Sequence, residues 1–252
     1  MSPPWPPGPR RSARLAISGS VWVVRHGQRI DQYDGDWWLT AERPHDPYLT
    51  ELGEQQATAA GEALMRASAR VDVIYSSPFL RCVQTAARCA KALGISKIRI
   101  EPGLGELLMA DWFDYAPVRE ASMPVDSGMS TKELVKRFGN LIDTTYTPLY
   151  DANERVAKAE QQSQHLITFP EDWHEGIARY QKTLAALSEA SPFSLLVTHG
   201  AGVQACAEAI EGCPDMSDMD VDYCCLTNLV RQGAYKWKVT TLADASHTAN
   251  LS

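Results

Sequence analysis

The chain has 252 residues, 44% of them hydrophobic, and a formal net charge of -7. That length is enough for one sizeable α/β domain with a core of normal proportions. The negative charge argues against a general nucleic-acid binder, because such proteins usually carry a basic face or stripe. No apolar run approaches the roughly 18–20 residues needed to span a membrane, so we expect no membrane association.

Cysteine usage indicates a reducing environment. The six cysteines form no C-x-x-C pair and no zinc-ligand spacing: Cys82, Cys89, Cys206, Cys213, Cys224 and Cys225. Buried free thiols are the simpler interpretation, and they favour a cytoplasmic protein.

The first 19 residues differ in composition from the rest of the chain. They are rich in Pro, Arg and Ser and contain no acidic residue. Their prolines oppose the amphipathic helix that targeting segments use. We therefore expect a disordered tail over residues 1–19 and one domain over residues 20–252.

Short apolar runs alternate with helical patterns along the chain. The first run, Val21–Val24, is typical of a strand buried on both faces. The later strands are predicted over residues 71–77, 97–102 and 193–200, with a terminal hairpin over 224–230 and 235–241. The helices between them are predicted over residues 50–64, 78–93, 130–141, 170–189 and 201–210. This alternation predicts an α/β fold, a three-layer α/β/α sandwich with a mostly parallel central sheet.

Capping residues set several helix boundaries. Thr50 can cap the first helix. Pro78 is expected to start the second helix, and Gly94 to end it. Residues from about 107 to 169 are less regular and contain one helical pattern, so we interpret them as a lid-like insertion in the same domain.

Two histidines follow strands in matching positions. Arg25, His26 and Gly27 come directly after the first strand, and His199 and Gly200 follow the most apolar strand. The carboxyl ends of parallel strands meet at one edge of a sheet, where ligands bind in open α/β folds. A lone histidine there is more often structural than catalytic. The matched pair beside an arginine favours catalysis by His26 and His199.

Three more charged side chains are predicted at this edge. Arg29 lies just beyond the first histidine, and Arg81 lies in the first turn of the second helix, where a cation opposes the helix dipole. Arg81 is either a solvated surface residue or a partner of Arg25 and Arg29 around an anion. Glu106 follows the third strand and is expected at the same edge.

These side chains suit phosphoryl transfer through a histidine. Imidazole is nucleophilic near neutral pH only while uncharged, and neighbouring cations favour that form. Arginine forks match phosphoryl oxygens and stabilise their charge. A carboxylic acid can protonate the leaving oxygen and then serve as the base for water. Because the arginines supply positive charge, we predict no metal ion and no other cofactor.

Five motifs in this order resemble the histidine phosphatase superfamily, also called phosphoglycerate mutase-like. They are RHG after a strand, DPYLTELGEQQA, SSPFLRCVQTA, the Glu after the third strand, and VTHG. The resemblance implies that His26 is the phosphorylated nucleophile and that Glu106 is the proton donor. It places three further residues in the phosphate pocket: Arg25, Arg81 and His199.

Within the superfamily, RHGQRID resembles the phosphatase domain of the suppressor of T-cell receptor signalling proteins, which carries a second arginine at the position of Arg29. Glycolytic mutases usually read Arg-His-Gly-Glu-Ser followed by a Trp-Asn segment. The downstream EPGLGELLMADWF also departs from the Asn-Glu-Arg segment of the mutases. Both departures favour a phosphatase over a mutase.

The sequence therefore predicts a metal-independent, histidine acid-type phosphatase that hydrolyses phosphomonoesters through a phosphohistidine. Its substrate is a phosphorylated small molecule or a phosphoprotein, and a homodimer stays open. One alternative is a phosphoglycerate mutase or a sugar-bisphosphate phosphatase of the same fold. Another is a catalytically weak protein-interaction domain, against which the retention of all six polar residues speaks.

The sequence leaves alternative roles for several other residues. The C-x5-R spacings that begin at Cys82 and Cys225 lack the glycines of a cysteine phosphatase loop, so we interpret them as coincidences. His45 is either structural or at the border of the pocket. The loop aromatics either pack locally or form a wall for a bulky leaving group: Tyr33, Trp37, Trp38, Trp112, Phe113 and Tyr115.

Overall fold

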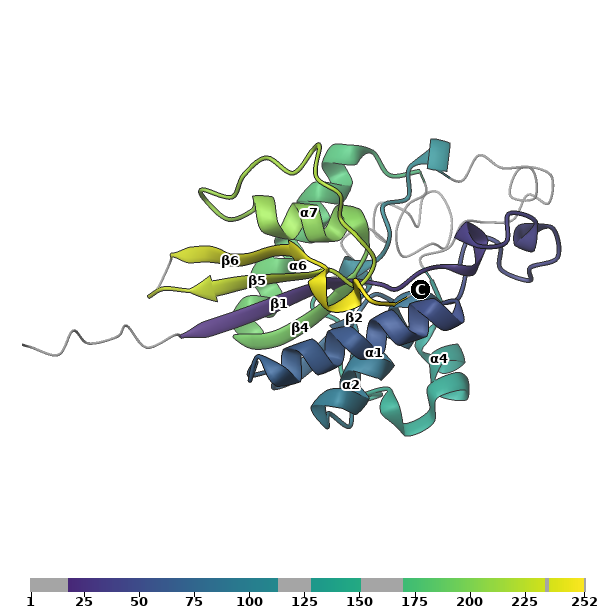
Figure 1. The fold of residues 1–252 in the computed structure, drawn as a ribbon, viewed down its shortest axis with the longest axis horizontal. Coiled ribbons are helices and arrows are strands. Elements are labelled where there is room, and N and C mark those ends of the chain that lie inside the picture. Colours follow the sequence, from purple (N-terminus) through teal and green to yellow (C-terminus); the bar gives the residue numbers. More distant parts are fainter. Residues whose placement is uncertain (1–17, 113–127, 151–169, 234–235, 252) are drawn as a thin grey trace, which may run out of the picture.

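A six-stranded mixed sheet forms the centre of the protein (Figure 1). The computed structural model describes residues 18–112, 128–150, 170–233 and 236–251. The strands are β1 (Gly19–Arg25), β2 (Val73–Ser76), β3 (Ile98–Ile100), β4 (Phe193–Thr198), β5 (Leu226–Arg231) and β6 (Trp237–Asp244). Their order in the sheet is β3-β2-β4-β1-β5-β6. The first four of these are parallel, and β5 and β6 complete the sheet as an antiparallel pair, which confirms the predicted terminal hairpin.

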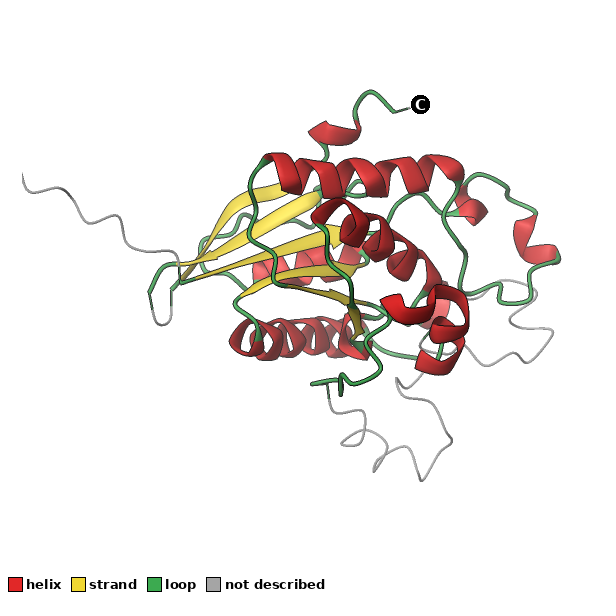
Figure 2. Ribbon diagram, turned by 90° about the horizontal axis from the view of Figure 1, so that it is seen from below, coloured by secondary structure: helices red, strands yellow, loops and turns green. Residues whose placement is uncertain are grey.

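Helices cover both faces of the sheet, as Figure 2 shows. They are α1 (Glu51–Arg66), α2 (Leu80–Leu93), α4 (Thr131–Phe138), α6 (Trp173–Ala190) and α7 (Gly200–Glu208). One core cluster packs α1, α2 and α4 against the sheet through side chains such as Leu64, Val83 and Leu134. A second cluster packs α6 and α7 through Leu187 and Val203. The predicted three-layer α/β/α sandwich is confirmed.

The caps explain where the helices begin and end. Thr50 accepts a hydrogen bond from the Gly53 amide at 2.9 Å, so α1 begins at Glu51 as expected. Gly94 ends α2 in the left-handed conformation, with φ at +69°. The predicted start of α2 at Pro78 is wrong by two residues, because the Leu80 amide donates to Asp46 at 2.8 Å and the helix begins only there.

The predicted insertion over residues 107–169 is described only in part. Residues 128–150 contain α4, whose Leu134 is fully buried, and Ile142 forms a parallel bridge with Ile98 at the edge of the sheet. This portion packs as part of the body of the domain. Residues 113–127 and 151–169 lie outside the described residues, as do residues 1–17 of the predicted tail. None of the described helices is both long and apolar enough to cross a membrane.

Candidate active site

The register of two neighbouring strands brings His26 and His199 together. Arg25 in β1 pairs with Thr198 in parallel strand β4, and the His26 amide donates to the Thr198 carbonyl at 3.0 Å. Each histidine directly follows its strand, so both rings lie at the carboxyl edge of the sheet. The ring centroids are 5.3 Å apart, and the two side chains are 1% and 0% exposed.

The His26 imidazole is neutral, and one of its ring nitrogens is free of a proton. Its Nδ1 lies 2.8 Å from the Gly27 carbonyl oxygen, which can only accept, so Nδ1 carries the proton and Nε2 keeps its lone pair. Burial lowers the pKa of His26 well below its ordinary value, and the charge of Arg81 lowers it further. The lone pair of Nε2 is therefore available at neutral pH.

Two glycines allow the loop that follows His26 to lie against the first turn of α1. A Cβ on Gly27 would lie 2.4 Å from the Gly53 carbonyl oxygen, and a Cβ on Gly53 would lie 2.3 Å from the Gln28 carbonyl oxygen. Such distances are far inside contact range. Only glycine allows the two backbones to approach this closely.

Arg81 is a buried anchor rather than a solvated surface residue, because it is 1% exposed. Its Nη2 donates to Glu106 at 2.9 Å and lies 3.2 Å from Nδ1 of His199, while Nη1 lies 3.7 Å from Asp46. Among the described residues, its Nε and Nη1 atoms have no hydrogen-bond acceptor. Buried guanidinium donors are costly when unpaired, so this geometry favours an anionic group beside them.

Glu106 and His199 form one buried pair. Glu106 Oε2 lies 3.1 Å from Nδ1 of His199, and Oε1 accepts the Leu107 amide at 3.0 Å. Burial alone would raise the pKa of Glu106, but His199 and Arg81 hold it well below its usual value. Burial lowers the pKa of His199 to about 4 despite its carboxylate partner. Glu106 is thus ionised, with the fixed charge of Arg81 beside it.

The remaining two predicted arginines have other partners. Arg25 donates from Nη1 to the Val221 carbonyl and lies over the Tyr223 ring, 4.2 Å from its centroid. Its buried Nε has no acceptor within the part of the chain that the structure describes. Arg29 donates from Nε to Asp31 at 2.9 Å and from Nη2 to the same carboxylate. The guanidinium of Arg29 is therefore already bound to Asp31, although its charge still lowers the pKa of His26.

Sequence reasoning missed three residues of this site. Ser77 lies 2.9 Å from Nε2 of His199, and Asp46 lies 3.7 Å from Nη1 of Arg81. Tyr223 packs against His26, with ring centroids 5.8 Å apart. Ser77 and Asp46 lie inside quoted motifs, so the motifs pointed to them. Tyr223 lies in a loop without any local signal.

The residues whose roles the sequence left open differ in their burial and contacts. His45 is buried beside Asp46, so it lies near the site, and Trp37 packs edge-on against Tyr48 at 5.7 Å. Tyr33 is 78% exposed and Trp112 is 48% exposed. Phe113 and Tyr115 lie outside the described residues. The contact of Trp37 supports local packing for that side chain.

Burial argues against Cys82 and Cys225 as the nucleophiles of a cysteine phosphatase. Cys82 lies beside His199, with Sγ 3.5 Å from Nε2, but burial raises the pKa of its thiol far above the ordinary value. Burial raises the pKa of Cys225 to about 12. Neither thiol forms the thiolate that nucleophilic attack needs.

Within the described part of the chain, one cluster could hold a metal ion. One ligand atom from each of His26, Glu106 and His199 lies within 4.8 Å of the others. Arg81 already donates to the same Glu106 oxygen. Together with Arg25 it would repel a cation, so the site suits an anion better than a metal ion.

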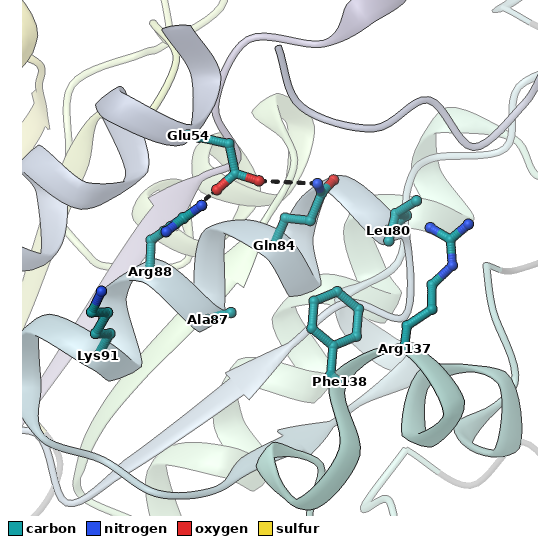
Figure 3. A pocket seen from close by; sticks show the side chains of 8 residues that line it. All are labelled: Glu54, Leu80, Gln84, Ala87, Arg88, Lys91, Arg137 and Phe138. Atoms are coloured by element: carbon teal, nitrogen blue, oxygen red, sulfur yellow. Dashed lines mark hydrogen bonds and ion pairs between the residues drawn. The ribbon is translucent and has the colours of Figure 1, made fainter. Parts of the chain in front are cut away.

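A second pocket lies away from this edge, between α1, α2 and α4 (Figure 3). It measures about 390 Å³, and its carboxylate, Glu54, accepts from Gln84 at 3.0 Å and from Arg88. Lys91 and Arg137 also line it. None of the six predicted site residues lines it.

Comparisons with known proteins fit this geometry. The model of the histidine phosphatase superfamily (branch 1) matches residues 21–126. Human ubiquitin-associated and SH3 domain-containing protein A is 29% identical over 229 residues, which cover 77% of this chain and 31% of that protein. This protein and the related protein B, which is 28% identical over 249 residues, are the suppressor of T-cell receptor signalling proteins that the RHGQRID motif resembles. The ecdysteroid-phosphate phosphatase of Drosophila melanogaster is 25% identical, covering 94% of this chain and 34% of that protein.

The chain thus spans about a third of the length of these curated relatives. Among solved structures, the ecdysone phosphate phosphatase from Bombix mori, in complex with tungstate, superposes with a TM-score of 0.63 at 24% identity. The match covers 89% of this chain and 93% of that one. This likeness confirms the phosphoglycerate mutase-like fold.

Proposed function

We propose that this chain, which matches the model of the histidine phosphatase superfamily over residues 21–126, hydrolyses phosphomonoesters through a phosphohistidine on His26. The observation that carries the proposal is the neutral, buried His26 imidazole beside a buried arginine, a second histidine and a carboxylate. Each has a distinct task in the two displacement steps.

In the first step, Nε2 of His26 attacks phosphorus and the bond to the leaving oxygen breaks. The free N–H groups of Arg81 and Arg25 donate to the phosphoryl oxygens, whose negative charge they stabilise. Glu106 gives its proton to the leaving oxygen. In the second step Glu106, now a carboxylate, takes a proton from water as the water attacks the phosphohistidine and frees the His26 nitrogen.

The proton on Glu106 has to come from somewhere, because the carboxyl is ionised before substrate binds. A phosphate ester loses its second proton near pH 6, so below that pH it arrives as a monoanion that carries a proton. The negative phosphoryl group also raises the pKa of a carboxylate beside it. This supports an acid-type phosphatase.

The pH profile of an alkyl phosphate should therefore lie on the acid side. We expect kcat/KM to fall as the pH rises above about 6, because the proton-carrying substrate is lost. We also expect activity to persist below pH 6.5, the ordinary pKa of histidine, because the pKa of His26 is lowered and the ring stays neutral. A profile that declines below pH 6.5 and stays flat up to pH 8 would contradict both arguments.

Turnover in H₂¹⁸O tests the proposed function itself. The chain should release inorganic phosphate that carries one ¹⁸O atom from nitrophenyl phosphate, and full activity should survive EDTA. Transfer of phosphate between positions of phosphoglycerate without release would indicate a mutase instead. Loss of turnover in EDTA, restored by a divalent ion, would show that the charge of the arginines is not sufficient.

We propose a phosphorylated small molecule or a phosphoprotein as the substrate, in keeping with relatives whose names include a phosphatase. The six cysteines are all free thiols, which supports the proposed cytoplasmic location.

A further inference from the structure

The loop that carries Glu106 follows a single 3-10 turn, Pro102–Leu104, and its carbonyls are bound by side chains. Four consecutive carbonyls, from Gly103 to Glu106, each accept a hydrogen bond from a buried side chain. Buried carbonyls that have no backbone donor need such partners. Thr198 donates to Leu104 at 2.8 Å, and Tyr180 donates to Gly105 at 2.5 Å. The path of this loop therefore depends on the side chains that bind it.

Arg179, in α6, supplies most of these bonds. Its Nη1 donates to the carbonyls of Gly103 at 2.9 Å and Gly105 at 3.0 Å, and its Nη2 donates to the Glu106 carbonyl at 3.1 Å. Its Nε and Nη2 donate to Glu171 at 2.8 Å and 2.7 Å. All five N–H groups of the guanidinium are thus used, in a side chain that is 2% exposed.

Glu171 completes the network on the other side. Its carboxylate balances the charge of Arg179, and it also accepts the Leu108 amide at 3.4 Å. The Glu171 amide donates to the Leu108 carbonyl at 2.8 Å. The loop is therefore held on both sides of Glu106.

Close packing fixes the distance between α6 and the loop. A Cβ on Gly103 would lie 2.2 Å from Thr183 Oγ1, and a Cβ on Gly176 would lie 1.9 Å from Leu107 Cδ1. Both contacts exclude a side chain at the glycine. Helix α6 therefore packs directly against the loop, so a shift of the helix would displace the loop.

We propose that Arg179, supported by Glu171 and Tyr180, is a positioning residue that sets where the Glu106 carboxylate lies. The inference rests on the proposed role of Glu106 as the acid. Arg179 binds the backbone of Glu106, whereas the carboxylate itself lies 2.9 Å from Arg81 and 3.1 Å from His199. A displacement of about 1 Å can cost about 10²-fold in rate. That loss should be confined to reactions that need the acid.

The test compares an alkyl substrate, glycerol phosphate, with nitrophenyl phosphate, whose leaving group needs little protonation. Arg179→Lys keeps a positive charge opposite Glu171 but cannot reach three carbonyls at once. We expect kcat/KM to fall about 10²-fold on glycerol phosphate and less than about tenfold on nitrophenyl phosphate. Tyr180→Phe removes one bond to the loop and should cost about tenfold on glycerol phosphate alone.

Two further arms separate positioning from general damage. Tyr75→Phe is the matched control, because Tyr75 is equally buried but its hydroxyl lies 2.9 Å from Ser191 Oγ, away from the loop; it should change neither substrate. In a Glu106→Gln background, adding Arg179→Lys or Tyr180→Phe should change kcat/KM by the same factor on both substrates.

Equal losses on both substrates, with Glu106→Gln still selective for glycerol phosphate, would overturn the positioning role and leave the acid role intact. If Glu106→Gln itself shows no selectivity, the acid role fails and the positioning proposal fails with it. Where Arg179→Lys does not fold, Tyr180→Phe decides, and unchanged activity of that variant on both substrates overturns the proposal.

Discussion

Replacing His26 with alanine should abolish turnover, with a loss in kcat of about 10⁴-fold or more. The His26 ring is the group whose Nε2 lone pair is free at neutral pH in this site, because its Nδ1 is tied to the Gly27 carbonyl and burial keeps the ring uncharged. Arg81 and Arg25 can still orient a phosphate, so binding should be affected far less than rate. The measurement is phosphate release by the variant at saturating substrate.

Trapping the covalent intermediate in the wild-type protein tests the same role of His26 directly. Wild-type protein, quenched rapidly without acid, should hold a phosphoryl group that is stable to alkali and labile to acid. His174→Ala is a suitable control, because His174 is exposed in the first turn of α6 and should leave turnover unchanged. Phosphate on Cys82 or Cys225 would contradict the mechanism, although the high pKa of both buried thiols argues against it.

The change Glu106→Gln should cost about 10²–10⁴-fold on an alkyl phosphate, the usual range for a positioned acid or base. An alkyl phosphate leaves as a strongly basic alkoxide and needs a proton, whereas nitrophenyl phosphate leaves as a weakly basic phenoxide. Glutamine keeps the size of the side chain and removes the acid. The same change should therefore cost much less on nitrophenyl phosphate. The measurement is kcat/KM for both substrates in wild type and variant.

A competing role for Glu106 is to orient Arg81, to which it is bound at 2.9 Å. Losing that role would weaken the stabilisation of phosphoryl charge for both substrates alike. Equal losses would therefore remove Glu106 from the acid role. Asp111 would then be tested next, although it is exposed, while Asp114 lies outside the described residues.

Signals that act over a few residues could be found from the sequence. The Thr50 cap, the Gly94 stop and the placement of His26 and His199 after strands all follow from short patterns, and the structure has them where expected. Parallel strands then bring both histidines to one edge, so a site near them was predictable before any side chain was placed.

Contacts between distant segments could not be found in this way. Arg179 lies in mid-helix and resembles any solvated charge, and only the folded loop shows why it is buried. Tyr223 meets Arg25 across 198 positions, from 25 to 223. Arg29, which we predict to bind an anion, donates to Asp31, two residues further on, when no substrate is bound. A charge pattern alone does not say which of two nearby ions a side chain will choose.

The position of β1 inside the sheet has a consequence for the biosynthesis of the protein. β1 lies between β4 and β5, and Arg25 donates to Val221, 196 positions later in the chain. His26 is therefore translated early, whereas β4 and β5, the strands on either side of β1, emerge from the ribosome late. A nascent chain that stops before Tyr223 cannot seat Arg25 or His26. The surroundings of His26 are therefore assembled only after the long-range strand pairs on both sides of β1 have closed.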